Sequence, residues 1–245
     1  MLVAVLHSPV SGDAGPDEQD TLRQVEAVSE ALARLGHRAL ALPCTLDLSA
    51  VASRLREIGP DLVFNLVETI AGGGRLLPVA ALLLDHIGLP YTGSPADALY
   101  LTSNKLLAKR VLRLHGVPVP DWVTAEELAR GTPPPSGLLI LKSAWEHASV
   151  GLDDDSLVEP EGASQLAEEL ARRREHLGRD AFAEVFLPGR EFNLSLLERR
   201  EGPSVLPVAE ILFLDYPADK PTTAHCLRVH RASYHQKPSS RIHPD

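Results

Sequence analysis

The sequence has little of several features that would assign it to a specialised class. Its 245 residues include only two cysteines, Cys44 and Cys226, which form no closely spaced pair. A disulfide framework or a cysteine zinc site is therefore not expected, and a reducing compartment is the default. Basic residues are outnumbered by acidic ones, 24 to 33, which leaves a net charge of −9. Because nucleic-acid binders usually carry a basic surface, this balance disfavours nucleic acid as a partner.

Long hydrophobic runs are also scarce. The N-terminal stretch MLVAVL is short and has no basic residues before it, so neither a signal sequence nor a membrane span is expected there. It is typical of a first buried strand. With 44% hydrophobic residues the chain is long and apolar enough to fold as one large domain or two small ones. We expect a cytoplasmic protein with no membrane partner.

The first part of the chain alternates strand and helix patterns. The segments LVAVL, RALALP and DLVFNLV are predicted strands, and apolar residues at helical spacing lie between them. Ser49 and Ser103 are candidate caps for two of the helices. This alternation predicts a parallel sheet with helices on both faces. Ligands of such folds bind at the carboxyl ends of the strands, where Glu68 and the glycines of residues 72–74 follow the third strand.

The pattern changes after a Pro/Gly-rich linker at residues 130–137. Four further strand candidates surround one predicted helix, residues 163–176, which favours a second domain of the α+β class with an antiparallel sheet. The fold class is therefore α/β followed by α+β. We expect domains at 1–118 and 119–220. A tail at 221–245, with no clear strand or helix period, is expected to be disordered.

Lys142 carries the strongest chemical signal before any comparison is made. It ends the apolar run LLILK and precedes a loop of small residues that reaches Gly151. Successive amides in such a loop can bind an anion, and a lysine adds a compact positive charge. Lysine is scarce here, at five of the 24 basic residues. The alternative interpretation is a solvated hairpin with an ordinary exposed lysine.

Other charged residues allow two interpretations in the same way. Lys105 begins a predicted helix, where it either supports an anion at the helix N-terminus or covers apolar surface with its stem. Lys109, one turn later, is expected to be an ordinary surface lysine. Glu184 and Glu191 flank a Pro-Gly turn and could accept bonds from an exocyclic amine and from ribose hydroxyls, or simply keep a hairpin soluble. Glu210 lies in an apolar strand and is expected to have a partner.

The order of these motifs resembles that of the ATP-grasp ligases, and within them the D-alanine–D-alanine ligase group. The stretches that carry the resemblance are DLVFNLVE, GLPYTGS, SNKLLAKRVLRLHGVPVPDW, LKSAWEHASVG, AEVFLPGREFNLSLL and AEILF. They span most of residues 2–220. The resemblance implies an N-terminal domain followed by an ATP-grasp domain, in a cytoplasmic enzyme of peptidoglycan synthesis that acts on amino-acid or dipeptide substrates. Members of the group are often homodimers.

The resemblance also implies roles for individual residues. ATP would be the cofactor, with its phosphates contacted by Lys105 and Lys142. The loop formed by Glu146, Ser149, Val150 and Gly151 would close over those phosphates, and Lys142 and Ser149 would act in catalysis. Glu184 would accept a bond from the adenine amine, the backbone of Phe186 and Leu187 would line the base, and Glu191 would bind the ribose. ATP would phosphorylate a carboxylate, and an amine would then attack the acyl phosphate.

The sequence departs from the group in three places. The loop after the third strand reads ETIAGGGRL instead of the usual His-Gly and Gly-Glu-Asp-Gly pattern, which puts specificity for D-alanine in doubt and leaves Glu68 as a substrate-binding candidate. Asp17 or Glu18 stands in for a glutamate near the first helix. Mg²⁺ is expected by resemblance, but the Asp and Glu-x-Asn set that would hold it is missing, so no residue is assigned as a metal ligand. We expect a C-terminal truncation or a shifted reading frame beyond residue 220.

Two alternatives to a D-alanine–D-alanine ligase follow from these departures. One is a nucleotide-binding fragment without catalysis, and the other is a ligase for different amino-acid or peptide substrates. On all three hypotheses Lys142→Ala is expected to abolish nucleotide binding with little change in the fold.

Overall fold

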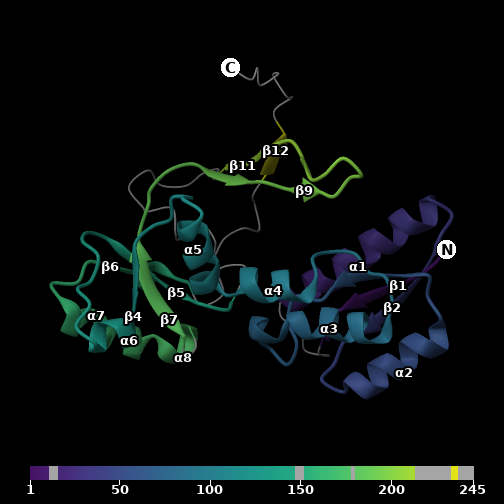
Figure 1. Cartoon of the computed structure of the whole chain (residues 1–245), viewed down its shortest axis with the longest axis horizontal. Coiled ribbons are helices and arrows are strands. Elements are labelled where there is room, and N and C mark those ends of the chain that lie inside the picture. Colours follow the sequence, from purple (N-terminus) through teal and green to yellow (C-terminus); the bar gives the residue numbers. More distant parts are fainter. Residues whose placement is uncertain (11–15, 147–151, 178–179, 213–232, 237–245) are drawn as a thin grey trace. The chain divides into compact units, whose positions relative to one another are not determined.

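The structure is a computed structural model of the whole chain, and it describes residues 1–10, 16–146, 152–177, 180–212 and 233–236. The chain divides into two compact units (Figure 1). The first is Met1–Val119 with Ala144–His147, and the second is Pro120–Ser143 with Ala148–Asp245. Of the described helices, none is both long enough and apolar enough to cross a membrane.

A parallel sheet forms the centre of the first unit, as the strand–helix alternation predicts. Strand β1 (Leu2–His7) lies between β2 (Arg38–Pro43) and β3 (Leu62–Leu66), so the strand order is β2-β1-β3. Both pairings are parallel, and Val3 lies opposite Ala39 on one side and Leu62 on the other. The carboxyl ends of β1 and β3 therefore meet at one edge of the sheet.

Helices cover this sheet because alternate strand residues point to opposite faces. Ala4 and Leu6 of β1 belong to a buried cluster with residues of α2 (Leu48–Ile58) and α3 (Pro78–Ile87). The remaining helices of the first unit are α1 (Pro16–Arg34), the 3-10 helix η1 (Gly74–Leu76), α4 (Ala96–Ser103) and α5 (Lys105–Leu114).

Two of the predicted helix caps are wrong. Asp47, not Ser49, caps α2, because its Oδ1 accepts a hydrogen bond from Ala50 N at 2.9 Å. Asn104, not Ser103, caps α5, and its Oδ1 accepts from Leu107 N at 2.9 Å. Ser103 instead ends α4. Aspartate and asparagine cap helices as well as serine does, so a choice between nearby cap residues depends on the backbone conformation.

The cap of α2 gives a stability prediction. We expect Asp47→Ala to lower the free energy of unfolding by about 1 kcal/mol, because the Ala50 amide loses its acceptor. The matched control is Ser49→Ala, an exposed position two residues further along the same helix. Urea titrations of the three proteins measure both effects. An equal or larger loss in Ser49→Ala would contradict the assignment of the cap.

An antiparallel sheet forms the centre of the second unit, again as predicted. Its order is β4-β7-β5-β6, from β4 (Trp122–Thr124), β5 (Leu139–Ser143), β6 (Leu157–Val158) and β7 (Ala181–Val185), and every pairing is antiparallel. Leu139, Leu141, Ala181 and Ala183 form a buried cluster with residues of helices that pack on the sheet. Those helices are α6 (Ala125–Ala129) and α7 (Ala163–Arg172), followed by the short α8 (Arg174–Leu177). The single predicted helix over residues 163–176 is thus two helices, which meet at Arg173.

The rest of the second unit consists of short strands. They are β8 (Glu191–Asn193), β9 (Leu196–Leu197), β10 (Ser204–Val205), β11 (Ala209–Leu212) and β12 (Ser233–Gln236), arranged as a β12-β11-β8 sheet and a β10-β9 pair. The stretches EFNLSLLE and SVLPVAEILF are each predicted as one strand but contain two short strands each, and Pro207 lies between β10 and β11. Within the segment expected to be a disordered tail, only β12 is among the described residues.

The expected partner of Glu210 is present. Arg190 donates to both carboxylate oxygens of Glu210 on β11, from Nε at 2.6 Å and from the terminal NH2 at 2.7 Å. This bidentate geometry suits a planar guanidinium. The hydrogen bond to Glu210 also raises the pKa of Arg190. The prediction that an acidic residue in this apolar strand is paired is therefore confirmed.

Candidate nucleotide and substrate site

An ion pair joins two of the predicted nucleotide-binding residues. Lys142 Nζ on β5 lies 2.6 Å from Glu184 Oε1 on β7. In the antiparallel register Lys142 is opposite Phe182, and Glu184 is opposite Ile140. Because residues two apart on a strand share a face, these four side chains lie on the same face of the sheet. The alternative interpretation, a solvated hairpin with an ordinary exposed lysine, does not account for this ion pair.

Burial of this pair is uneven. The side chain of Glu184 is 9% exposed, whereas that of Lys142 is 30% exposed. The lysine therefore keeps access to solvent while its charge compensates a nearly buried carboxylate, which would otherwise be costly to desolvate. Such a lysine can contact a phosphate oxygen and remain close to Glu184.

The segment after β7 holds the remaining nucleotide-binding candidates. The amide of Phe186 donates to Leu138 O at 2.9 Å, so this amide serves the sheet. Leu187 is exposed, and Glu191 is half-buried as the first residue of β8. The second unit thus contains Lys142, Glu184, Phe186, Leu187 and Glu191.

Lys105 holds the segment of residues 144–146 in the first unit. Its backbone amide donates to Ala144 O at 2.9 Å, and its Nζ donates to the carbonyl of Glu146. The amide belongs to the first residue of α5, where helix N–H groups have no partner within the helix. The structure therefore brings together Lys105, which is predicted to contact the phosphates, and Glu146, which is predicted to belong to the loop that closes over them.

The side chain of Trp145, in the same segment, makes two further contacts with the first unit. Its ring is 8% exposed and lies 5.5 Å from the ring of Tyr100, at an interplanar angle of 54°. The guanidinium of Arg75 stacks over Trp145 at 5.2 Å from the ring centroid, a cation–π contact. A Cβ at Gly73 would lie 4.0 Å from Glu146 Oε1. The glycine loop after β3 therefore packs against the segment that leads to the predicted phosphate loop.

Glu68, the first substrate-binding candidate, lies at the carboxyl edge of the parallel sheet. Ser8, directly after β1, accepts hydrogen bonds through Oγ from the amides of Glu68 and Thr69, each at 3.0 Å. His7 bonds through Nδ1 to Ser8 O at 2.8 Å. Ser8 is buried and Glu68 is exposed, so the serine holds the backbone while the carboxylate faces outward.

Three other residues of the first unit, Asp17, Glu18 and Cys44, add no described contact to the candidate site. Asp17 and Glu18 lie in the first turn of α1, and their side chains are outside the described part of the structure. Cys44 follows β2, and burial raises the pKa of its thiol to about 11. The thiol is therefore protonated at neutral pH and is a poor nucleophile.

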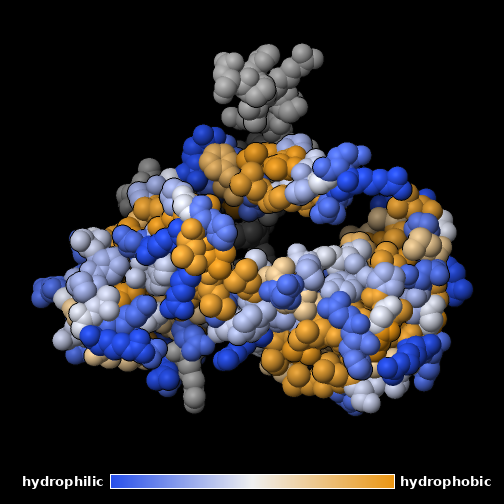
Figure 2. Space-filling model, in the orientation of Figure 1, coloured by the Kyte–Doolittle hydropathy of each residue, from blue (hydrophilic) through white to orange (hydrophobic). Residues whose placement is uncertain are grey.

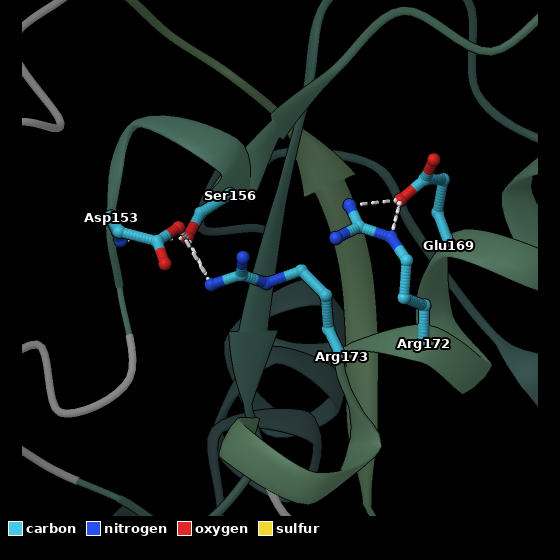
Figure 3. Close-up of polar contacts among 5 residues, drawn as sticks. All are labelled: Asp153, Ser156, Glu169, Arg172 and Arg173. Atoms are coloured by element: carbon cyan, nitrogen blue, oxygen red, sulfur yellow. Dashed lines mark hydrogen bonds and ion pairs between the residues drawn. The ribbon is translucent and has the colours of Figure 1, made fainter.

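A polar network around the buried Arg173 holds the segment that follows the predicted phosphate loop (Figure 3), and in it the Asp153 side chain is 51% exposed. A terminal nitrogen of Arg173 lies 2.7 Å from Asp153 Oδ1 and 3.1 Å from Ser156 Oγ. Ser156 Oγ also donates to Asp153 Oδ1 at 3.0 Å. Arg173 is 3% exposed. Burial alone would raise the pKa of Asp153, but the hydrogen bonds from Arg173 and Ser156 outweigh it and lower that pKa.

The predicted loop residues Ser149, Val150 and Gly151 lie outside the described residues. Their contacts with phosphates, and the catalytic role of Ser149, stay predictions. What the structure describes are the two flanks of the loop, residues 144–146 in the first unit and residues 152–156 in the second.

The sequence did not indicate the burial or the contacts of four residues that the structure shows near the candidate site or in the network of Figure 3. Lys109 was expected on the surface but is 8% exposed. Ser8, Arg75 and Arg173 were not singled out. A polar pair directly after a buried strand could have pointed to Ser8. Nothing local distinguishes Arg173 from its neighbours in the run of residues 172–174.

The described residues do not supply a magnesium site. In residues 1–10, 16–146, 152–177, 180–212 and 233–236, no group of three or more His, Cys, Asp or Glu side chains could hold a metal ion. Mg²⁺ requires several oxygen ligands in near-octahedral geometry. No chemical step is therefore assigned to a metal held by these residues.

Comparisons with known proteins agree with this arrangement. No protein-family model matches the sequence. The crystal structure of D-alanine–D-alanine ligase from Bacillus anthracis complexed with ATP is similar, with a TM-score of 0.61 at 16% identity. The match covers 98% of this chain and 71% of that chain. The fold is therefore that of the ATP-grasp ligases.

Curated relatives define the family more closely. The D-alanine–D-alanine ligase of Moorella thermoacetica (strain ATCC 39073 / JCM 9320) is 31% identical over 236 residues, which cover 89% of this chain and 70% of the relative. That of Synechococcus sp. (strain JA-3-3Ab) is 32% identical over 224 residues, 85% of this chain and 64% of the relative. The chain belongs to the D-alanine–D-alanine ligase family. It spans about two thirds of the length of these relatives.

Proposed function

We propose that the chain acts as an ATP-dependent carboxylate–amine ligase of the D-alanine–D-alanine ligase type, with Lys142 and Glu184 in its nucleotide site. The observation that carries the proposal is the Lys142–Glu184 pair, 2.6 Å apart on one face of the β5–β7 sheet, in a chain 31% identical to a curated ligase. The comparisons do not favour a non-catalytic nucleotide-binding fragment.

The residues of the second unit fit a nucleotide. Lys142 binds a phosphate oxygen through Nζ, and Glu184 accepts a hydrogen bond from the adenine amine. The Phe186 amide is engaged with Leu138, so the carbonyl of Phe186 and the backbone of Leu187 line the base. Glu191 accepts bonds from the ribose hydroxyls. When bound, ATP supplies the phosphoryl group that activates a carboxylate for attack by an amine.

The first unit contributes a cation and the substrate edge. Lys105 is held at the N-terminus of α5, where both its charge and the helix dipole favour an anion. Substrates of this family are small amino acids, and Glu68, which is exposed at the sheet edge, binds a substrate ammonium group in this proposal. The loop that contains Arg75 replaces the usual family pattern. The identity of the two substrates that the ligase joins therefore needs its own measurement.

Phosphate release from Mg-ATP by the purified chain, with and without D-alanine, tests the proposal. We expect release that D-alanine stimulates, since phosphate leaves the acyl phosphate only when an amine attacks it. Nucleotide binding is measured in parallel with a fluorescent ATP analogue. Release stimulated by another amino acid but not by D-alanine would support the ligase and correct its substrate. Absence of nucleotide binding would contradict the proposal.

A further inference from the structure

The loop that follows β3 is held by hydrogen bonds along its length. Ser8 Oγ accepts from the amides of Glu68 and Thr69, each at 3.0 Å, which fixes the start of the loop. Further along, Ile70 and Gly73 exchange backbone hydrogen bonds of 3.3 and 3.4 Å across a tight turn. A loop that is held in this way presents its side chains in defined directions, as a binding site requires.

The tight turn reverses the chain. Its central residues, Ala71 and Gly72, both have positive φ angles, of 52° and 75°, as in a type I′ turn. Such a conformation is uncommon for alanine, so the contacts around the turn impose it. The reversal leaves the exposed Glu68 on the incoming arm and the exposed Arg75 on the outgoing arm. One loop at the carboxyl edge of the parallel sheet, where ligands of such folds bind, therefore carries one acidic and one basic side chain.

The side chain of Arg75 is oriented by an aromatic pair. Its guanidinium lies over the ring of Trp145, 5.2 Å from the centroid, and Trp145 in turn packs against Tyr100. Stacking uses the face of the guanidinium, whereas its N–H donors lie in its plane. The group can therefore stay stacked while it donates to an acceptor at its edge. A carboxylate suits this geometry because it accepts parallel hydrogen bonds from arginine.

Apolar residues adjoin Arg75 in the chain and in space. Helix α3 begins shortly after it and has no charged residue before Asp85. Figure 2 shows hydrophobic residues gathered over this helix, which is labelled in Figure 1. Trp145, on which the guanidinium stacks, is 8% exposed. An ion pair formed beside such a surface is stronger than one in open water, because the local dielectric constant is lower.

The chemistry of the proposed reaction indicates which carboxylate Arg75 binds. Because Glu68 and Arg75 lie on the two arms of one turn, we expect one substrate molecule to contact both. Glu68 binds the ammonium group of that substrate, and its α-carboxylate points to the nucleotide from which it receives the phosphoryl group. The carboxylate that remains for Arg75 is one on the side chain. An aliphatic side chain offers no acceptor to the guanidinium, so such a site discriminates against alanine.

We propose that Arg75 binds the side-chain carboxylate of the substrate that is phosphorylated, so that the ligase activates an acidic amino acid in preference to alanine. The inference rests on the proposed function, since it names the substrate class of that same site. Arg75 acts here as a specificity-determining residue, and the amine that attacks the acyl phosphate can still come from a different amino acid.

Binding of single amino acids tests the inference without turnover. Calorimetry measures the Kd of glutamate, aspartate and alanine, each in the D and the L form, for the complete 245-residue chain with a non-hydrolysable ATP analogue present. We expect glutamate or aspartate to bind at least about tenfold more tightly than alanine of the same configuration. Tighter binding of alanine, or no binding of either acidic amino acid, would overturn the inference.

Variants of Arg75 identify the contact. Arg75→Gln should abolish the preference for the acidic amino acid, and Arg75→Lys should keep part of it, since lysine retains the charge without the parallel donors. The matched control is Arg54→Gln, which removes an exposed arginine of α2 that pairs with Glu57. It should leave the preference unchanged. A loss of affinity in Arg75→Gln that is equal for acidic amino acids and alanine would assign Arg75 to the fold or to a carboxylate that all amino acids share, and would overturn the inference.

Phosphate release from Mg-ATP separates the inference from the proposed function. It is measured with D-alanine alone and with D-alanine plus an acidic amino acid. Release that the acidic amino acid raises further would support both. Release with D-alanine alone, without binding of an acidic amino acid, would keep the ligase and overturn the inference. Binding of an acidic amino acid that Arg75→Gln abolishes, without release under either condition, would support the contact at Arg75 and contradict the proposed function.

Discussion

Replacing Lys142 by methionine should weaken binding of an ATP analogue by about a hundredfold. The ammonium group is the positive charge that the β5–β7 sheet offers to a phosphate, and removing a charge-assisted donor in a partly desolvated site has effects of this order. Titration with a fluorescent ATP analogue measures the change. Affinity within twofold of the unaltered chain would remove Lys142 from the nucleotide site.

The structure also changes the expected effect of this substitution on the stability of the fold. From the sequence we expected little effect on the fold, because loop residues follow Lys142. Its ammonium group in fact compensates Glu184, whose side chain is 9% exposed. Removing the lysine alone leaves that carboxylate uncompensated, so the free energy of unfolding should fall by about 1–3 kcal/mol.

A double variant separates the two effects. Lys142→Met combined with Glu184→Gln removes the buried charge along with its partner, so most of the lost stability should return. Binding of the nucleotide should not return, because the phosphate contact is still missing. Recovery of both properties in the double variant would show that Lys142 acts only through the fold.

Arg173→Met should lower the free energy of unfolding by about 2 kcal/mol, and Arg172→Met should change it by less than about 0.5 kcal/mol. The two arginines are adjacent and each has an acidic partner (Figure 3). Arg173 is 3% exposed and bonds to Asp153 and Ser156, whereas the side chain of Arg172 is 56% exposed and pairs with Glu169. Exposed pairs contribute little because water screens them, while a broken buried network leaves polar groups without partners.

The effect of Arg173 should also depend on pH. The pKa of Asp153 is lowered in the folded state, so its contribution is fully present above the unfolded value of about 3.9 and is lost as pH falls through the folded value. The difference between the unaltered chain and Arg173→Met should therefore shrink below about pH 4. Urea titrations at pH 7 and pH 3.5 measure it. A difference that is the same at both pH values would contradict the Asp153 contact.

The predictable features of this fold are those that depend on local periodicity. Alternation of apolar strands and amphipathic helices identified the parallel sheet of the first unit, and clustered strands identified the antiparallel sheet of the second. The caps were less predictable, since Asp47 and Asn104 lie beside serines of equal capping strength. Lys109 was misjudged because its burial depends on neighbours that the helix pattern does not name.

The sequence allowed individual candidate residues of the site to be named, but it did not allow their contacts to be predicted. Lys142 and Glu184 were both identified, yet their pairing depends on the register of two strands separated by 42 positions in the sequence. No local pattern fixes such a register. The stacking of Arg75 on Trp145 joins segments 70 residues apart and depends on the course of the whole first unit. The resemblance predicted which residues bind the nucleotide, and the structure shows that two of these residues, Lys142 and Glu184, form an ion pair.

The return of residues 144–146 to the first unit has a consequence for synthesis of the chain. When the first 119 residues have left the ribosome, the carbonyl acceptors of the Lys105 amide and ammonium groups have not yet been made. The aromatic partner of Tyr100 and Arg75 is also still missing. The first unit therefore lacks these contacts at the start of α5 until strand β5 of the second unit and residues 144–146 have been translated. The first unit is therefore completed by residues 144–146, which are translated only after residues 120–143 of the second unit.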